Sequence, residues 1–421
     1  MKQKQRPTRY KRDASNISPN SMELRSPEAF WLLKNGIPYN YPSLRENIAC
    51  DIAVVGSGIT GALISHTLHR AGYKTVVIDK RDVANGSTAA TTSMLQYEID
   101  VPMQRLAGMI GEKGALTCYR EGIASIEILE ELLIREGIEA GFERKKSLQV
   151  AHSEKGVADL EKEYRTRKEH GFRVEWLSPK EIRERYCMDS HPGILSDEGA
   201  SIDAFRAAHE LISRNHARGM QVYDHTPVRE VQHETDHVKI IAESGFHICS
   251  KRVVYCTGFE TLRMFRRKYA DVISTFACVS EQSFGLYPQL KDLLIWDTAN
   301  PYIYMRTTDD GRLLVGGEDI PYTYNPVGEK IKNRKTGKLV KKVEKLFPGL
   351  TFLEDYTWAG AFGVTKDGLP FIGEHPDFPN AIFVLGLGGN GITFSVQGME
   401  LVLKILAGED HPLLHYYRFD R

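Results

Sequence analysis

The chain has 421 residues, a length for which two domains are expected, and its 55 basic and 55 acidic residues give a formal net charge of zero. That balance argues against a polyelectrolyte partner, so nucleic-acid binding is not expected. The six cysteines are scattered without a C-x-x-C pair, which excludes a zinc site and a disulfide framework and predicts a cytoplasmic protein without a metal.

The N-terminal residues 1–25 are rich in Lys and Arg and poor in large apolar side chains. They lack the apolar segment of a signal peptide. We predict a disordered basic tail here, and favour it over an arm that binds nucleic acid or membrane. Elsewhere no apolar run approaches the ~18 residues of a membrane span.

The stretch from Cys50 to Arg81 predicts a strand, a glycine turn, a helix and a second strand. Gly56, Gly58 and Gly61 have G-x-G-x-x-G spacing, in which the glycines allow a tight turn, close approach to a pyrophosphate, and helix–strand packing. Asp79 ends the second strand, where an acid binds a ribose 2′-OH. An acid there argues against a 2′-phosphate and favours FAD or NAD over NADP.

Small uncharged residues dominate 83–95, which indicates a segment lying against a ligand. The apolar spacing within 103–137 predicts mainly helix with a core-facing stripe. A hairpin is expected from strands at 302–306 and 313–317, joined by an Asp-Asp-Gly turn. Further helices are expected at 157–170, from Ser178 with a capping box, at 202–217, and at 330–347, and strands at 142–151, 222–231, 238–242 and 252–256.

A second glycine cluster follows an apolar strand at 382–385, in the sequence GLGGNG from Gly386 to Gly391. A helix is expected to begin near Ile392 or Thr393. Consecutive backbone N–H groups at a helix N-terminus would stabilise negative charge on a reduced flavin. A chain with both glycine clusters suits FAD, because a nicotinamide dehydrogenase would not need the second one.

These motifs resemble the D-amino-acid oxidase superfamily of FAD-dependent oxidoreductases, over roughly residues 31–407. The resemblance also rests on GSTAATTS, on the Thr257–Gly258 pair, and on the TKDGLPFIG run from Thr365. It implies an α/β fold with a discontinuous Rossmann-like FAD-binding domain and a substrate domain built on an antiparallel sheet. We assign residues 26–100, 196–262 and 351–421 to the first and residues 101–195 and 263–350 to the second.

The resemblance implies oxidation of a C–N bond by hydride transfer to flavin N5, followed by hydrolysis of the imine. It also assigns residues to parts of the cofactor. The pyrophosphate would contact Gly56, Ser57, Gly58, Ile59 and Gly61, and the adenosine Asp79, Lys80 and Val228. The segment with Ser87, Thr88, Thr92 and Ser93 would line the pyrophosphate and the isoalloxazine, and Thr257 and Gly258 would also bind the cofactor. The pyrimidine end of the flavin would contact Gly389, Asn390, Gly391, Ile392 and Thr393.

The chain departs from the superfamily in two ways. The amino-acid oxidases carry an arginine for the substrate carboxylate just before the TKDG-type run, and here that stretch lacks one, which favours an amine. Arg306 could substitute, although a salt-bridged strand residue is the favoured interpretation. The segments in which covalent-flavin members carry His or Cys have neither, so FAD should be non-covalent.

The catalytic side chains expected on the substrate side of the flavin are Tyr304, Arg306 and Trp358, with Glu318 as a further candidate. Gln96, Tyr97 and His209 are also considered, but a buried polar role is favoured for each. Two alternatives stay open: a flavoenzyme acting on RNA or a sugar-linked amine, and a non-catalytic flavin-binding partner subunit. The electron acceptor and the particular amine or amino acid are not predicted.

Overall fold

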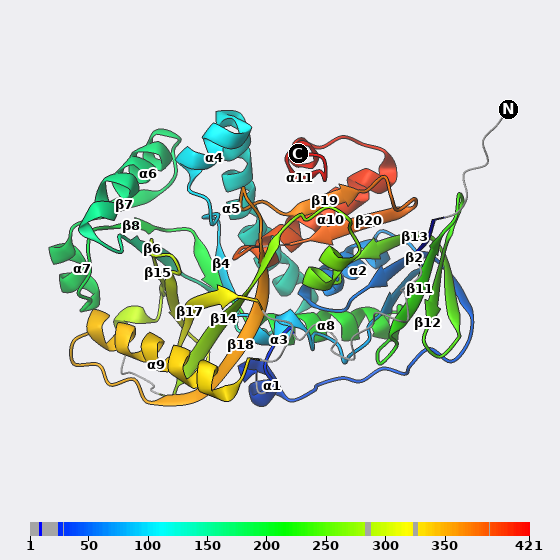
Figure 1. The fold of residues 1–421 in the computed structure, drawn as a ribbon, viewed down its shortest axis with the longest axis horizontal. Helices are drawn as coiled ribbons and strands as arrows, with labels where there is room; N and C mark the ends of the chain where they lie inside the picture. Colours follow the sequence, from blue (N-terminus) through cyan, green and yellow to red (C-terminus); the bar gives the residue numbers. More distant parts are fainter. Residues whose placement is uncertain (1–7, 11–23, 28, 283–287, 323–326, 387) are drawn as a thin grey trace.

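The computed structural model describes residues 8–10, 24–27, 29–282, 288–322, 327–386 and 388–421. Two large sheets organise these residues, and a small sheet of β4 (Met94–Gln96), β9 (Gly199–Ser201) and β5 (Glu143–Arg144) accompanies them (Figure 1). Within this part of the chain, no helix is both long and apolar enough to cross a membrane.

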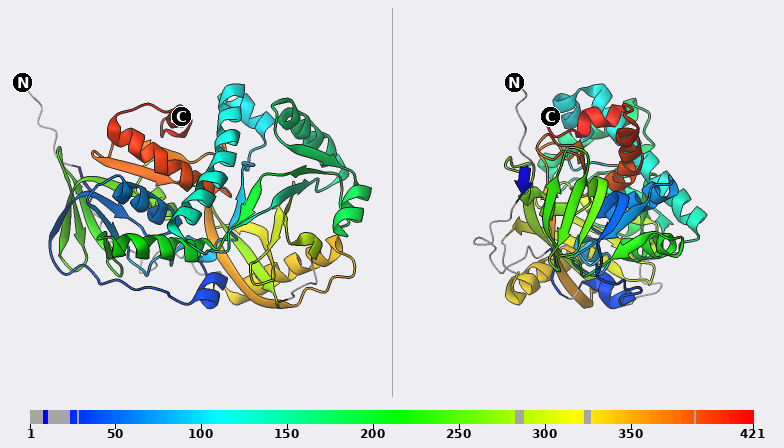
Figure 2. Two further views of the ribbon diagram at one scale, coloured as in Figure 1. Left: turned by 180° about the vertical axis from the view of Figure 1, so that it is seen from behind. Right: turned by 90° about the vertical axis from the view of Figure 1, so that its right-hand side faces the viewer.

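The first sheet has nine strands and a parallel centre in which β20, β13, β2, β3 and β10 are neighbours. Three helices pack against one another on one face of it (Figures 1 and 2). Successive side chains of a buried parallel strand serve both faces, which explains the apolar runs seen in the sequence. The bounds are β2 Ile48–Val55, β3 Thr75–Ile78, β10 Gln221–Tyr223, β13 His247–Tyr255, β20 Ala381–Leu385, α2 Ile59–Arg70, α8 Ala204–Ala217 and α10 Gly391–Ala407.

The strand expected at 222–231 is wrong as a single element. It divides into β10, which pairs with β3, and β11 (Val228–His233), which pairs with β12 (Val238–Ala242). Pro227 lies in the intervening turn and cannot donate a ladder hydrogen bond. The turn lets the chain leave the parallel centre and begin an antiparallel extension.

The second sheet has eight strands in the order β18-β14-β17-β16-β15-β6-β8-β7, antiparallel at every pair except β15–β6. The helix α9 (Glu329–Leu346) covers one face through Leu339 and Val343. The hairpin of β16 and β17 is confirmed. The bounds are β6 Lys146–Val150, β7 Val174–Leu177, β8 Gly193–Ser196, β14 Asp271–Ser280, β15 Leu293–Asp297, β16 Ile303–Thr307, β17 Leu313–Pro321 and β18 Glu354–Val364.

The helices expected between the sheets are present with small changes. The helical stretch from residue 103 breaks at Gly111, where φ is +82°, into α4 (Met103–Ile110) and α5 (Glu112–Glu136). The helix α6 spans Val157–Glu169, and α7 (Pro179–Tyr186) begins with the expected capping box.

The domain limits expected from the sequence stay a prediction. At two places the packing of the elements differs from those limits. Residues 351–421 were assigned to the FAD-binding domain, yet β18 is an edge strand of the second sheet. Residues 101–195 were assigned to the substrate domain, yet α5 packs against α10.

The basic tail is wrong as a uniformly disordered segment. Residues Thr8–Tyr10 form β1, which pairs antiparallel with β11. Further on, Arg25 forms a β-bridge with Gly360, and Ser26 donates its N–H to the carbonyl of Ala359 at 2.9 Å. The other residues of 1–23 lie outside the described part of the chain.

Candidate functional site

A cavity of about 1120 Å³ lies between the two sheets. It starts at the carboxyl ends of β2 and β3, passes the N-termini of α2 and α10, and ends against β14, β15 and β16. Cavities that bind drug-sized molecules measure roughly 300–1,000 Å³, and this one is larger.

The glycine turn before α2 forms as its spacing predicts. Gly56 has φ of +104°, and a Cβ there would lie 2.5 Å from the carbonyl oxygen of Cys256. A Cβ on Gly61 would lie 1.8 Å from the Gly56 oxygen, so glycine is required for helix and strand to meet. Gly56, Gly58 and Ile59 line the cavity, whereas Ser57 is fully buried behind them.

Asp79 lines the cavity but does not act alone. Its carboxylate accepts hydrogen bonds from the N–H of Ser57 at 2.7 Å, the Ser57 hydroxyl at 2.8 Å and the N–H of Arg81 at 3.0 Å. Burial raises the pKa of Asp79, and these hydrogen bonds oppose that rise. Lys80 and Arg81 pair with Glu260 at 2.5 and 3.3 Å. Sequence reasoning missed Glu260, which follows the Thr257–Gly258 pair and places a second acid at the ribose end.

Val228, Thr257 and Gly258 line the same end of the cavity. Ser87, Thr88, Thr92 and Ser93 line its middle part. The Thr88 hydroxyl also accepts the N–H of Ile59 at 3.0 Å, which ties this segment to the start of α2. The structure therefore brings these predicted residues to one continuous wall.

Three successive carbonyls at positions 90–92 are each held by a donor from a different element. The indole of Trp358 on β18 donates to Ala90 at 2.8 Å, and the indole of Trp31 on α1 (Phe30–Asn35) donates to the next carbonyl at 2.6 Å. The guanidinium of Arg306 on β16 donates to Thr92 at 2.7 Å. We call this arrangement the carbonyl clamp. It fixes the wall of the cavity from behind.

Arg306 therefore does not line the cavity. It is neither the clamp for a substrate carboxylate nor the salt-bridged strand residue that the sequence suggested. It is 2 % exposed, and besides Thr92 it donates to the carbonyls of Thr307 and Ile202 at 3.1 and 3.0 Å. Burial lowers its pKa to about 10. It binds main-chain oxygens rather than a substrate carboxylate or an acidic side chain.

The second glycine cluster joins β20 to α10, which begins at Gly391. Gly389, Asn390, Gly391 and Ile392 line the cavity, whereas Thr393 is buried and donates to the carbonyl of Asn390 at 2.9 Å. The Asn390 amide donates to the carbonyls of Gln96 and Glu98, both at 2.9 Å. The helix N-terminus is therefore aimed at the cavity and tied to the chain that follows β4.

Aromatic side chains from the second sheet close this end of the cavity. Trp296, Tyr302, Tyr304 and Trp358 line it, and the two tyrosine rings lie 5.4 Å apart between centroids. Alternation along β16 places positions 302 and 304 opposite Ile303 and Met305, which pack under α9. Sequence reasoning identified Tyr304 and Trp358, but missed Trp296, Tyr302 and Asp100.

Of the remaining candidates, Gln96 lines the cavity, whereas Glu318, Tyr97 and His209 do not. Glu318 does not line it: residues 317 and 318 of β17 both have positive φ, and the register of β17 on β14 shifts here. The Glu318 side chain consequently pairs with Lys335, Lys338 and Lys342 of α9. Tyr97 stacks on Phe172, and His209 is buried beside Phe205.

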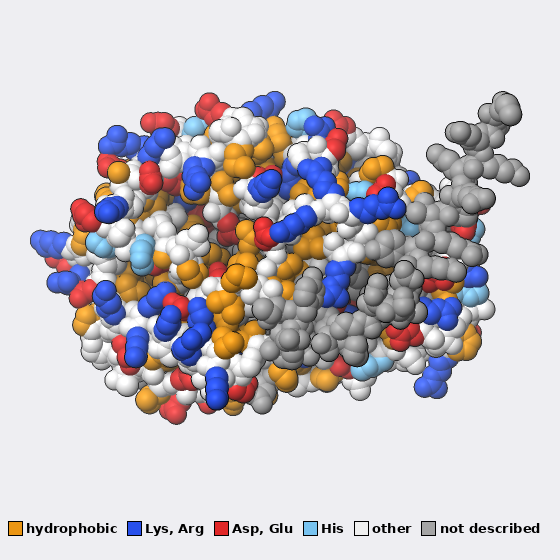
Figure 3. Space-filling view, viewed as in Figure 1, with side chains coloured by type: hydrophobic (Ala, Val, Ile, Leu, Met, Phe, Trp, Pro, Cys, Tyr) orange, Lys and Arg blue, Asp and Glu red, His pale blue; other side chains and the backbone are white. Residues whose placement is uncertain are grey.

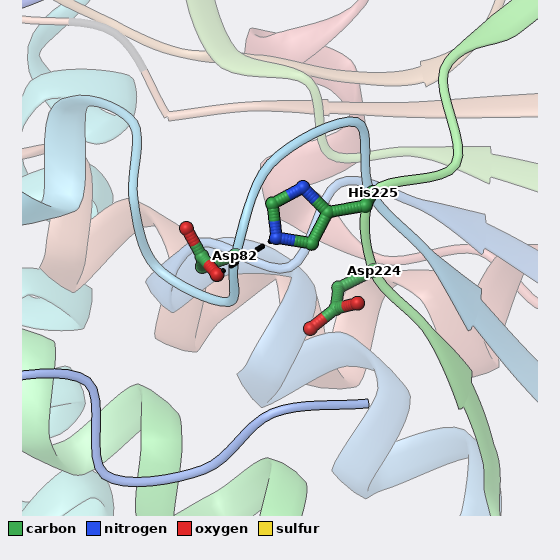
Figure 4. A group of neighbouring side chains, drawn as sticks. All are labelled: Asp82, Asp224 and His225. Atoms are coloured by element: carbon green, nitrogen blue, oxygen red, sulfur yellow. Dashed lines mark hydrogen bonds and ion pairs between the residues drawn. The ribbon is translucent and has the colours of Figure 1, made fainter. Parts of the chain in front are cut away.

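A separate group of Asp82, Asp224 and His225 has potential ligand atoms within 4.8 Å of one another. Figure 4 shows the His225 ring turned toward Asp82, with which it forms a 2.9 Å hydrogen bond that raises its pKa. Asp224 accepts the N–H of Tyr41 at 2.9 Å. These bonds connect neighbouring loops and already account for the group.

The residues lining the cavity fit FAD. FAD suits two groups of N–H donors along one channel, one for the pyrophosphate and one for the flavin, and the N-termini of α2 and α10 provide them. Any side chain at Gly56 or Gly61 would collide with backbone atoms, so the turn before α2 requires glycine at both positions. The fold and the site define a flavin-dependent oxidoreductase with a dinucleotide-binding sheet and a second sheet closing the flavin end.

The sequence profile of the family described as "FAD dependent oxidoreductase" (DAO) matches residues 51–402, and the chain belongs to this family. It is 26% identical to the gamma-glutamylputrescine oxidoreductase of Escherichia coli (strain K12), over 88% of this chain and 86% of that protein. It is also 26% identical to the glycine oxidase of Bacillus licheniformis, over 85% and 93% of the two chains. The crystal structure of glycine oxidase from Geobacillus kaustophilus has a similar fold, with a TM-score of 0.73, 22% identity, and coverage of 87% of this chain and 96% of that one.

Proposed function

We propose that this enzyme oxidises a carbon–nitrogen bond of an amine or amino acid. The proposal rests on one observation: a single cavity runs from the glycine turn before α2 to the end lined by aromatic side chains, beside the loop before α10. The names of the two relatives, for glycine and gamma-glutamylputrescine, both denote compounds with C–N bonds and support it.

In this proposal bound FAD supplies the hydride acceptor, and the chain supplies position and exclusion of water. The substrate carbon loses a hydride while the nitrogen lone pair forms the C=N bond. Water then adds to the imine, which breaks into a carbonyl compound and a free amine or ammonia. The reacting amine must be neutral, so the chain has to orient it more than to remove a proton during the hydride step.

The carbonyl clamp gives Trp358 and Arg306 positioning roles in this proposal rather than catalytic ones. Both hold the 90–92 segment, and only Trp358 also lines the cavity. Tyr304 has its ring in the cavity and its hydroxyl 3.3 Å from that of Thr275. A Cβ on Gly316 would lie 2.3 Å from the Tyr304 ring, so the ring lies directly against the backbone of β17 and requires glycine there.

The test uses the purified holoenzyme without oxygen and a panel of amines, N-methyl amino acids and D-amino acids. Loss of the visible flavin absorption on addition of one of them is the expected result. The matched control for each compound is the hydroxyl analogue with the same carbon skeleton, which should leave the spectrum unchanged. A flavin that every hydroxyl analogue bleaches, and no amine does, contradicts the proposal.

Action on RNA depends on the basic helix α9 and gains little support. Figure 3 shows Lys and Arg side chains gathered over α9. Three of these lysines pair with Glu318, and Lys332 pairs with Glu329 at 2.9 Å. Charges engaged in this way favour a solvated helix face.

A further inference from the structure

The aromatic end of the cavity contains a carboxylate that neither FAD nor the hydride step requires. Asp100 follows β4 and lines the cavity with its side chain exposed to that space. One oxygen accepts the N–H of Gly389 at 2.9 Å, which leaves the other oxygen available. The same glycine places Tyr302 nearby, because a Cβ on Gly389 would lie 3.4 Å from the Tyr302 hydroxyl.

The lysines and arginines that line the cavity are confined to one end of it, whereas acidic side chains line both ends. Its described lysines and arginines, Lys80, Arg81, Arg229 and Arg263, all follow β3 or belong to the adenosine end near β11 and β13. The described residues lining the aromatic end contribute no cation and two acids, Glu98 and Asp100. Glu98 has Arg167 behind it at 3.6 Å, while Asp100 makes no ion pair with any residue that the structure describes.

A second observation points to a ligand in the same place. Glu98 is only 4 % exposed, and its Oε2 atom has no hydrogen-bond partner within the described structure. Arg167 supplies a positive charge 3.6 Å from the other oxygen of Glu98, so what Oε2 lacks is a hydrogen-bond donor. Desolvation by the surrounding cavity walls raises the pKa of Asp100, the N–H of Gly389 opposes that rise, and a bound cation would oppose it further.

We propose that this end of the cavity, with Asp100 and the rings of Trp296, Tyr302 and Tyr304, binds a second, non-reacting ammonium group of the substrate. The inference rests on the proposed function and names its substrate class as aliphatic diamines. A carboxylate keeps a neighbouring ammonium protonated, so Asp100 suits the nitrogen that does not react. Aromatic faces add cation–π attraction, and a substrate carboxylate would meet like charge.

The binding test uses the holoenzyme and tetramethylammonium, whose nitrogen has no lone pair and cannot form an imine. Calorimetry should detect its binding, and Asp100→Asn should weaken that binding roughly tenfold or more, because one ionic partner is lost. Asparagine keeps an oxygen for the Gly389 N–H, so flavin content should be retained. The matched control, Asp292→Asn, removes an exposed carboxylate outside the cavity and should change nothing. The neutral isostere tert-butanol should be indifferent to Asp100→Asn.

The kinetic test compares 1,4-diaminobutane with butylamine. In Asp100→Asn, the ratio of KM for the diamine to KM for the monoamine should rise roughly tenfold. Should this variant lose its flavin, Trp296→Leu replaces it, with weaker tetramethylammonium binding expected. Unchanged cation affinity and an unchanged ratio of the two KM values in these variants overturn the subsite. Binding of tetramethylammonium that depends on Asp100, in an enzyme whose flavin no amine bleaches, supports the subsite and overturns the proposed function alone.

Discussion

At the scale of single residues, Arg306 shows how a side chain with the right charge serves a different purpose from the expected one. Its donors meet carbonyls at positions 92, 202 and 307. The partners are main-chain atoms from distant segments, and a sequence pattern cannot distinguish them from a substrate carboxylate.

Arg306→Met should destabilise the holoenzyme by about 1–3 kcal/mol per carbonyl left unpaired in the interior, and should weaken FAD retention. Denaturant unfolding and flavin content measure the two effects. KM values for substrates with and without a carboxylate should change by the same factor. A rise in KM confined to carboxylate-bearing substrates would return Arg306 to the role of a substrate clamp.

Gly61→Ala should abolish FAD binding and destabilise the protein by more than about 3 kcal/mol, because the new methyl group collides with backbone rather than with a movable side chain. Thermal unfolding and flavin content check this. Gly108→Ala is the matched control: its position in α4 has no atom within 4 Å of an added Cβ. It should stabilise α4 by about 0.5–1 kcal/mol.

Asp319 gives the stability a pH dependence. Burial raises its pKa from 3.8 to about 6, opposed by Thr275 and Lys335 and assisted by Asp100 and Glu318. A carboxyl group with a raised pKa favours folding most below its unfolded pKa, and this contribution is lost as the pH rises through about 6. The free energy of unfolding of Asp319→Asn, relative to that of the native chain, should therefore rise as the pH goes from about 4.5 to about 7.5, by at most about 3 kcal/mol.

Unfolding of both proteins at the two pH values measures this gain. A difference between them that is the same at both values would contradict it.

At the scale of elements, local signals predicted the glycine turn, the α7 capping box and the β16–β17 hairpin, because each depends on a few neighbouring residues. The split between β10 and β11 was signalled by Pro227 and by the polar residues Asp224, His225 and Thr226 before it. The aromatic end of the cavity could not be predicted in this way, because Asp100, Tyr302 and Gly389 come from three segments far apart in the chain. No local pattern contains that proximity.

The attachment of α10 to the β4 side of the molecule depends on Asn390. Asn390→Ala should remove two hydrogen bonds and leave the Gln96 and Glu98 carbonyls unpaired. The free energy of FAD binding should become less favourable by about 1–3 kcal/mol. Equilibrium titration of the apoprotein with FAD measures this. Asn333→Ala, at an exposed position of α9, serves as control and should leave affinity unchanged.

At the scale of the whole molecule, the cavity is bounded by both large sheets, so FAD should stabilise both together. Removing FAD should lower the free energy of unfolding by about 2.7 kcal/mol relative to a concentration 100 times Kd. Thermal unfolding followed by far-UV dichroism and by tryptophan fluorescence should shift equally. FMN, which lacks the adenosine half, should shift both less. A shift seen by one probe only would show that the sheets respond separately.

The carbonyl clamp also has a consequence for biogenesis. Its donors come from positions 31, 306 and 358, and its acceptors lie at 90–92. A ribosome delivers the glycine turn and the acceptors long before the last donor. The nascent chain can therefore complete its dinucleotide turn early, while the wall beside the flavin stays unsupported until β18 emerges. We therefore expect FAD to bind late in synthesis, after β18 has joined the second sheet.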